Sequence, residues 1–546
     1  MAYDDETPGA EPKPLTFEGH HNERSRVSEN TAIFAFFTAL SRVAGLGREA
    51  IASSYFGTTI YASAFTIASQ IPNLMANLFA QAALSAAFVP VFTDLLRRGR
   101  KQEAFRLASS LFWIVLIVLG VITGLGILFS RELLPLLGGS NFDGSLTATL
   151  TQIMFPVVLL LGLTGVITGI LQSYDEFSLP ALAPIVWNGV IIVLLVVLHH
   201  HLGDNPKKSI YAYAIAWVLA TVVQLVLIAY ALRRIDFRLS FRVDWHDPRI
   251  AHVFKLMLPV TLGLGIINLD ALINSSMGAL VHTDPAGAGP RAIQLAFLLY
   301  MLPQGIFSVA VSTVLFPTLS RQASARRPRE MRHTLANGMR QINLLLIPSA
   351  AGLMVLARPI VQLVFEHGTF NLLSLDLTSK ALFWFAWSLP FAGLNLLMTR
   401  TFFALQRPWL PTKLAAINMT VDIIVSVGLF KPFGIAGLVI GTAAANIVMA
   451  YIQFRRLRIG FNGNLEGGKT LMISARVIVV SAVMAVIARL AWDLLHSVFG
   501  GSIIGQIISV GGAVLIAAAF YAWAISHMRI TEWDQIESMF RRRLGI

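Results

Sequence analysis

The feature that most constrains this chain is a series of fourteen apolar stretches. A helix of about 20 apolar residues crosses the hydrocarbon core of a bilayer, and in lipid every backbone polar group needs an internal partner. The pattern therefore predicts an all-α polytopic membrane protein with fourteen transmembrane helices. The stretches cover residues 31–57, 61–96, 105–130, 146–173, 180–200, 209–232, 252–281, 290–319, 335–364, 376–405, 411–430, 434–454, 470–496 and 502–527.

Composition agrees with a membrane protein. Only 13% of the 546 residues are charged, about half the share found in soluble proteins. The net charge of +13 comes from basic residues beside the apolar stretches, which favours a topological role over nucleic-acid binding. Residues 1–30 are polar and lack an apolar signal segment, so we expect a disordered cytoplasmic tail. The histidines at 199–201 end one stretch and are interpreted as an interfacial loop rather than a metal site.

Basic residues cluster in alternate loops, within residues 97–106, 233–249, 321–332, 455–469 and 541–543. Lysine and arginine mark the cytoplasmic side of membrane proteins. Both termini are therefore predicted to be cytoplasmic, including a basic tail at 529–546.

An internal repeat divides the chain. Landmark residues recur about 230 positions apart, in the pairs Pro72 and Pro303, Pro156 and Pro390, Gln172 and Gln406, and Asn188 and Asn418. Each copy holds six helices, so both copies begin on the same side of the membrane. We expect two parallel six-helix halves at 31–235 and 250–460, with two added helices at 468–528. Transporter sites typically lie between such halves.

The second stretch carries a polar stripe at spacings of 7, 3, 4 and 4, which is one face of a helix. A wall of a water-filled cavity is the favoured interpretation, and hydrogen bonding between helices is the alternative. The stripe consists of Ser63, Gln70, Asn73, Asn77 and Gln81.

Two arginines, Arg42 and Arg48, lie inside the first stretch, where an unpaired charge is expensive. Planar guanidinium groups bind phosphate oxygens in pairs, so these residues are candidates for an anionic ligand. A structural pair with Glu49, or snorkelling to the membrane surface, is the alternative.

Two acids also lie within apolar stretches, Asp270 with Asn274 and Asp422 with Asn418, and Thr442 follows on the next stretch. Carboxylate, amide and hydroxyl oxygens are ligands that alkali cations accept, and an acid alone carries a proton. This set is a candidate site for Na⁺ or H⁺ coupling, with interhelical hydrogen bonding as the alternative.

Known catalytic motifs are absent from the sequence. There is no GxxxxGK[ST] nucleotide-binding loop, no HExxH and no GxSxG. We therefore expect a transporter rather than an enzyme, without a bound cofactor, driven by an ion gradient, the membrane potential or the gradient of its own substrate.

Four segments resemble motifs of the MurJ (MviN) lipid II flippases of the MOP exporter superfamily, and the resemblance covers about residues 31–530. "SRVAGLGREA" is similar to SRxxGxxRD, and "SAFTIASQIPNLMANLFAQAALSAAFVPVF" to DAFxxAFxxPNxxRRxxAEGAxxxAFVPxx. "SYDEFSLPALAPIVWN" resembles NxxxRFxxPAxAPxxxN, and "LPQGIFSVAVSTVLFPTLS" resembles FPxGxxGxAxxxxLLPxLS.

The resemblance implies a V-shaped pair of halves around a cationic cavity in the bacterial cytoplasmic membrane. It implies outward transport, by alternating access, of an undecaprenyl-pyrophosphate-linked peptidoglycan precursor, with the last two helices forming a groove for the lipid tail. Arg42 and Arg48 match two cavity arginines of the family and would hold the pyrophosphate. We expect a monomer in contact with membrane lipids and cell-wall synthesis proteins, and no nucleic-acid partner.

The chain also departs from the family pattern. Acidic and basic family positions are occupied by uncharged residues, namely Ser63, Ala76, Gln81, Phe297 and Leu298. The turn "LQRPWLP" lacks the usual Asp-Thr. A flippase for another polyprenyl-linked saccharide, or a small-molecule exporter of the same superfamily, is therefore an alternative. A membrane transferase and a non-transporting scaffold are alternatives from other classes.

Overall fold

The structure is a computed structural model that describes residues 37, 40–79, 82–133, 144–174, 176, 178–202, 205–235, 237, 239–241, 247–281, 287–407, 409–463, 465–528, 530 and 532–533. Side chains at 76–79 and 82–87, and at some positions of α3 and α10, are also outside the description. The tail expected at 1–30, the side chain of Asn77 and all of Gln81 lie outside the described residues.

The described chain is helical throughout. The first helix is described over residues 40–56. The others are α2 (Ile60–Phe79), α3 (Ala82–Arg97), α4 (Lys101–Leu128), α5 (Ser130–Leu133), α6 (Gly144–Met154), α7 (Pro156–Ser173), α8 (Ser178–Leu202), α9 (Pro206–Ala231), the 3₁₀ turn η3 (Leu232–Arg234), α10 (Pro248–Leu280), α11 (Gly289–Pro303), the π-helix η4 (Gln304–Ser308), α12 (Val309–Ser324), α13 (Pro328–Val355), α14 (Ala357–Phe365), α15 (Leu372–Ala404), α16 (Trp409–Phe433), α17 (Ile435–Gly460), α18 (Gly467–Phe499) and α19 (Ile503–His527).

Helical segments occupy all fourteen predicted stretches, but the count of fourteen membrane spans is not confirmed. Within the described ranges, ten helices are long and apolar enough to cross a membrane, or eleven if α13 and α14, bent by 74°, form one span. The stretch predicted at 61–96 is described as α2 and α3, and the two residues between them, 80–81, lie outside the description. The 33-residue α10 is not among the ten, and it carries Asp270, Asn274 and two serines.

Helix starts follow local sequence signals. Asn205 caps α9 by accepting a hydrogen bond from the backbone N–H of Lys208 at 3.1 Å, and Pro206 follows in the first turn. Asp247 and Pro248 begin α10 in the same way. A side-chain acceptor satisfies a backbone donor that the helix leaves free, and proline at the first position has no donor to satisfy.

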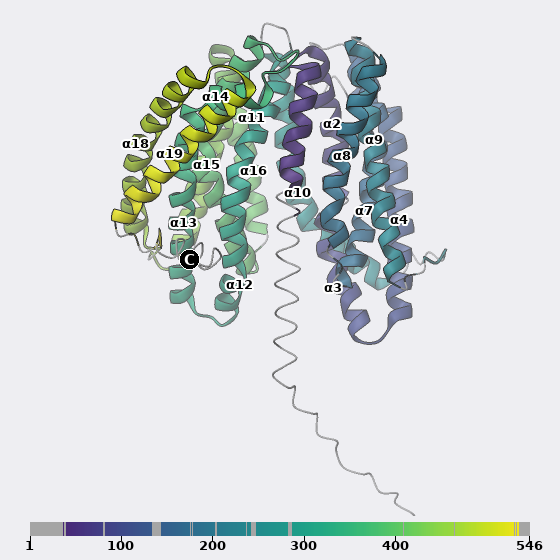
Figure 1. Ribbon diagram of the computed structural model, residues 1–546. Helices are drawn as coiled ribbons and strands as arrows, with labels where there is room; N and C mark the ends of the chain where they lie inside the picture. Colours follow the sequence, from purple (N-terminus) through teal and green to yellow (C-terminus); the bar gives the residue numbers. More distant parts are fainter. Residues whose placement is uncertain are drawn as a thin grey trace, which may run out of the picture.

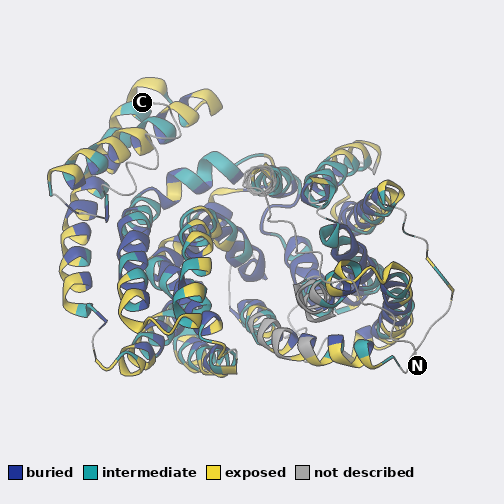
Figure 2. Ribbon diagram, turned by 90° about the horizontal axis from the view of Figure 1, so that it is seen from below, coloured by how far each residue is buried: buried dark blue, intermediate teal, exposed yellow. Residues whose placement is uncertain are grey.

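The helices form two groups that lie side by side, and α18 and α19 flank the second group (Figure 1). Seen from below, exposed residues face outward on both groups and along the last two helices (Figure 2). Since these exposed residues are largely apolar, among them Leu471, Ile504 and Leu515, the outer surface suits contact with lipid.

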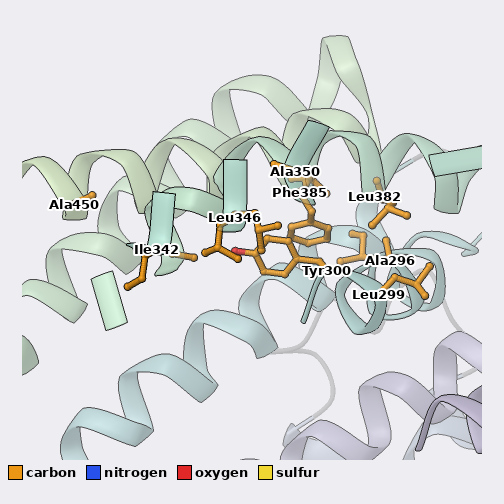
Figure 3. Close-up of a cluster of buried hydrophobic side chains, with 14 of the residues drawn as sticks. Ala296, Leu299, Tyr300, Ile342, Leu346, Ala350, Leu382, Phe385 and Ala450 are labelled. Carbon is orange, nitrogen blue, oxygen red and sulfur yellow. The ribbon is translucent and has the colours of Figure 1, made fainter. Parts of the chain in front are cut away.

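Each half has its own apolar core. In the C-terminal half, Tyr300 and Phe385 lie among Leu299, Leu346 and Leu382 (Figure 3). In the N-terminal half, α4, α7 and α3 pack around Phe88, Phe92 and Leu111. Helix α10 joins both: Val253 and Met257 belong to the N-terminal core, and the same helix packs against α16.

Candidate functional site between the two halves

Arg42 lies on the first helix and reaches the C-terminal half. Its guanidinium lies against Gly305 in η4, so closely that a Cβ built on Gly305 would be 2.9 Å from Nη2 and closer still to Nη1 and Cζ. The residue is partly buried. In the described part of the chain Arg42 has no acidic partner.

Arg48 lies six residues further along the same helix, and its two terminal nitrogens are engaged. Its Nη2 is 2.6 Å from Oε1 of Glu49, and Nη1 donates to Asn188 Oδ1 at 3.1 Å. The guanidinium carbon also lies 4.9 Å and 4.8 Å from the ring centroids of Trp187 and Trp217. Cation–π contact stabilises such a charge away from water. The predicted pairing of Arg48 with Glu49 is therefore present in this conformation.

Glu49 also binds a second arginine from the other half. Its Oε2 lies 2.8 Å from Nη1 of Arg291 on α11, and both side chains are buried, at 5% and 2% exposure. Arg291 further donates to Gln294 Oε1 at 2.7 Å and to Ser53 Oγ at 3.4 Å. One carboxylate thus bridges two guanidinium groups across the contact between the halves.

The polar stripe of α2 faces the same contact. Gln70 donates to the Ser275 hydroxyl on α10, and the neighbouring Thr66 donates to Gln294 Oε1 at 2.8 Å. Ser63 is fully buried and Asn73 is partly buried. In this conformation Gln70 makes an interhelical hydrogen bond, as the alternative interpretation of the stripe expected.

One end of the contact is closed by backbone. Thr369 N–H, in the loop before α15, donates to Ser54 C=O at 2.8 Å, and the hydroxyls of Thr58 and Ser374 are 2.7 Å apart. Gly57 and Gly368 both have positive φ and face this seam, and a Cβ on Gly57 would lie 2.8 Å from Thr369 C=O. Glycine permits both the backbone conformation and the close approach. We call these contacts the seal.

Most residues of the predicted cation site lie together in the C-terminal half. Asp422 on α16 is 1% exposed, and its carboxylate accepts hydrogen bonds from Asn274 at 2.8 Å, Ser426 at 2.9 Å and Thr442 at 3.1 Å. The Asp270 carboxyl lies near that of Asp422, and its Oδ1 is buried without a hydrogen-bond partner in the described chain. The Nδ2 of Asn418 is buried and has no partner in the described chain. Gly441 leaves room for this cluster, since a Cβ there would lie 2.8 Å from Asp422 Oδ1.

A cavity of about 1650 Å³ lies between α13, α15, α17 and α18. Its lining is largely apolar, with charged residues confined to Arg458, Glu466 and Arg489. Gly467 and Arg489 both line it from α18, and 22 residues of helix rise about 33 Å, which is about the thickness of the hydrocarbon core.

Sequence reasoning missed several residues of the site. Arg291 was not among the predicted site residues, and Trp187, Trp217 and Gln294 gave no signal. Ser426 lies one turn after Asp422, so a search for polar residues four positions from each acid would have found it.

Comparisons with known proteins agree with this arrangement. The sequence model of the family "Lipid II flippase MurJ" matches residues 52–507. The lipid II flippase MurJ of Burkholderia cenocepacia is 29% identical over 432 residues, covering 77% of this chain and 82% of that protein. The probable lipid II flippase MurJ of Bdellovibrio bacteriovorus is 26% identical, covering 92% of this chain and 95% of that one.

Solved structures share the fold. A lipid II flippase MurJ in an inward closed conformation superposes with a TM-score of 0.73 at 22% identity, covering 94% of this chain and all of that one. An inward-facing multidrug resistance MATE transporter of the MOP superfamily has a TM-score of 0.63 at 16% identity, covering 79% of this chain and 94% of that one. With a family match over most of its length and the same fold, this chain is a multi-span membrane protein that belongs to the MurJ lipid II flippase family.

Proposed function

We propose that this protein carries lipid II, the undecaprenyl-pyrophosphate-linked peptidoglycan precursor, from the inner to the outer leaflet of the bacterial cytoplasmic membrane by alternating access. The observation that carries this proposal is the charge at the contact between the halves. Arg42, Arg48 and Arg291 gather there against one acid, Glu49. Buried charge without a counter-charge is costly, so the excess calls for an anion such as pyrophosphate.

Arg42 is the first contact for that pyrophosphate, because it alone of the three has no acidic partner among the described residues. Its planar fork can donate two parallel hydrogen bonds to phosphate oxygens. Arg48 and Arg291 share Glu49 in the present conformation. They become available to an anionic ligand only as the halves move and that sharing ends.

The apolar cavity beside α18 takes the polyprenyl tail. It is lined by side chains such as Phe383, Trp387 and Tyr451, and it is long enough to span the hydrocarbon core. A tail held there keeps the lipid in a bilayer-like environment while the polar head group passes between the halves.

The cluster around Asp422 supplies the coupling. Two carboxyls, the Asn274 amide and the hydroxyls of Ser426 and Thr442, from three helices, converge in a site that a Na⁺ ion or a proton would neutralise. Hard oxygen ligands of this kind suit Na⁺. Binding of the cation in one conformation and release in the other would tie the movement of the halves to the ion gradient.

The basic loops favour a cytoplasmic position for both termini and for the C-terminal ends of α3 and α12. With that orientation, the seal faces the outside and the structure is closed outward. Cell-wall synthesis proteins are the expected partners, and the chain acts as a monomer.

The test is reconstitution of the full chain in liposomes with fluorescent lipid II, scored by outward movement of the head group, and rescue of a bacterial strain depleted of its own lipid II flippase. We expect both to succeed. Transport of another polyprenyl-linked saccharide but not of lipid II would favour the sister function, which the uncharged Phe297 and Leu298 make the second candidate. Failure with every polyprenyl lipid, by well-folded protein, would refute flippase activity.

A further inference from the structure

We infer that Gly305 is a positioning residue of the pyrophosphate site, which it serves by leaving open the space that the Arg42 guanidinium occupies. This inference rests on the proposed binding of pyrophosphate by Arg42. It adds a backbone position in η4 of the C-terminal half to the residues that surround Arg42.

The contact between Gly305 and the Arg42 guanidinium is very close. The nearest neighbour of Gly305 is the charged end of the Arg42 side chain. A Cβ at this position would fall within the guanidinium itself, touching Nη1, Cζ and Nη2. Any residue but glycine would therefore displace Arg42 from its present place.

The local helix geometry has a second peculiarity at the same place. Residues Gln304–Ser308 form a π-helix between α11 and α12, directly after Pro303. Short π segments inside α-helices are frequent at functional sites. The π turn and the missing side chain coincide at the point where the Arg42 guanidinium, from the other half, contacts this helix.

This placement has a mechanistic consequence. With its guanidinium on η4, Arg42 spans the contact between the halves, so an anion bound to it is held at that contact rather than at the wall of one half. A shifted guanidinium would keep its charge but lose the planar alignment that two parallel hydrogen bonds require. Gly305 therefore governs the affinity for pyrophosphate through the position of Arg42, not through its own contacts.

The test compares Gly305→Ala, Arg42→Ala and the double variant in the full chain. Binding is measured in nanodiscs with lipid II, with undecaprenyl pyrophosphate, and with undecaprenol, which has no phosphate. The clashing atoms belong to the far end of a flexible side chain, so Gly305→Ala should fold with Arg42 turned aside. Gly120→Ala is the matched control, because a Cβ there meets nothing within 4 Å.

We expect Gly305→Ala to weaken binding of both pyrophosphate lipids on the order of tenfold, close to the loss in Arg42→Ala, since a charge-assisted hydrogen bond is worth about that much. Undecaprenol binding should not change. In the Arg42→Ala background, Gly305→Ala should have no further effect. If the single variant misfolds, removing the Arg42 side chain should restore folding.

Different results identify which idea fails. If Arg42→Ala leaves lipid II binding intact, the proposed role of Arg42 is wrong and the inference about Gly305 falls with it. If Arg42→Ala weakens binding but Gly305→Ala does not, only the inference is overturned. Equal losses from Gly305→Ala with and without Arg42 would also overturn it, because Gly305 would then act independently of the arginine.

Discussion

Replacing Arg291 with methionine should open the seal without unfolding the protein. Arg291 is the only residue of the described C-terminal half that forms an ion pair with Glu49, at 2.8 Å and with both side chains nearly inaccessible. Methionine has a side chain comparable in length to that of arginine, but it is apolar and carries no charge. In the variant, Glu49 keeps Arg48 at 2.6 Å, so no buried charge is left without a counter-charge.

The magnitude follows from what is lost. The variant loses the ion pair with Glu49 and the hydrogen bond to Ser53, both across the halves. A contact made by a charged group contributes about 1.5–3 kcal/mol, which shifts the balance between closed and open states by about tenfold to a hundredfold. Glu49→Gln is the opposite case. It leaves Arg48 and Arg291 buried together without an acid, which costs about 3–5 kcal/mol, and it should lower the thermal stability of the whole protein.

The assay uses the absence of cysteine from the chain. Thr58 lies in the seal and is 2% exposed, so a single Thr58→Cys variant reports opening through its reaction rate with a soluble thiol reagent. We expect Arg291→Met to raise that rate about tenfold or more. Arg98→Met is the control, because Arg98 pairs with Asp94 on the surface of one helix. An unchanged rate in Arg291→Met would refute the idea that this ion pair holds the halves together.

Three further predictions follow from other parts of the molecule. Asp422→Asn should abolish the dependence of transport on Na⁺ or on the proton gradient, and Gly441→Ala should do the same by crowding Asp422; retained ion dependence in both would make the cluster structural. Single cysteines replacing Arg98 and Arg327 should react only with reagents that reach the cytoplasmic side, and labelling from outside would reverse the topology. The Arg249 guanidinium holds the pKa of Asp247 below its usual range. This pair therefore stabilises the start of α10 above about pH 4, and the stabilisation is lost as the pH falls through the Asp247 pKa of the folded state. Asp247→Asn should therefore flatten the acid limb of a thermal-stability profile, whereas an unchanged limb would show that the pair contributes nothing.

The sequence by itself determined where the helices lie, because a helix that crosses a bilayer needs a continuous apolar stretch and that is a local property. It also pointed to Arg42, Arg48, Asp270 and Asp422, since a charged residue in such a stretch is costly wherever it is placed. The departure in the number of spans arose where polar residues interrupt the apolar pattern, as in α10.

Only the tertiary structure decided what each of these charges contacts. Glu49 could have neutralised either neighbouring arginine, and it was the packing of α11 against the first helix that brought Arg291 to it. Likewise, the place of Arg42 depends on a glycine in η4 of the other half. Electrostatic interactions act through space and are stronger in a low dielectric, so partners far apart in the chain are set by how the helices pack.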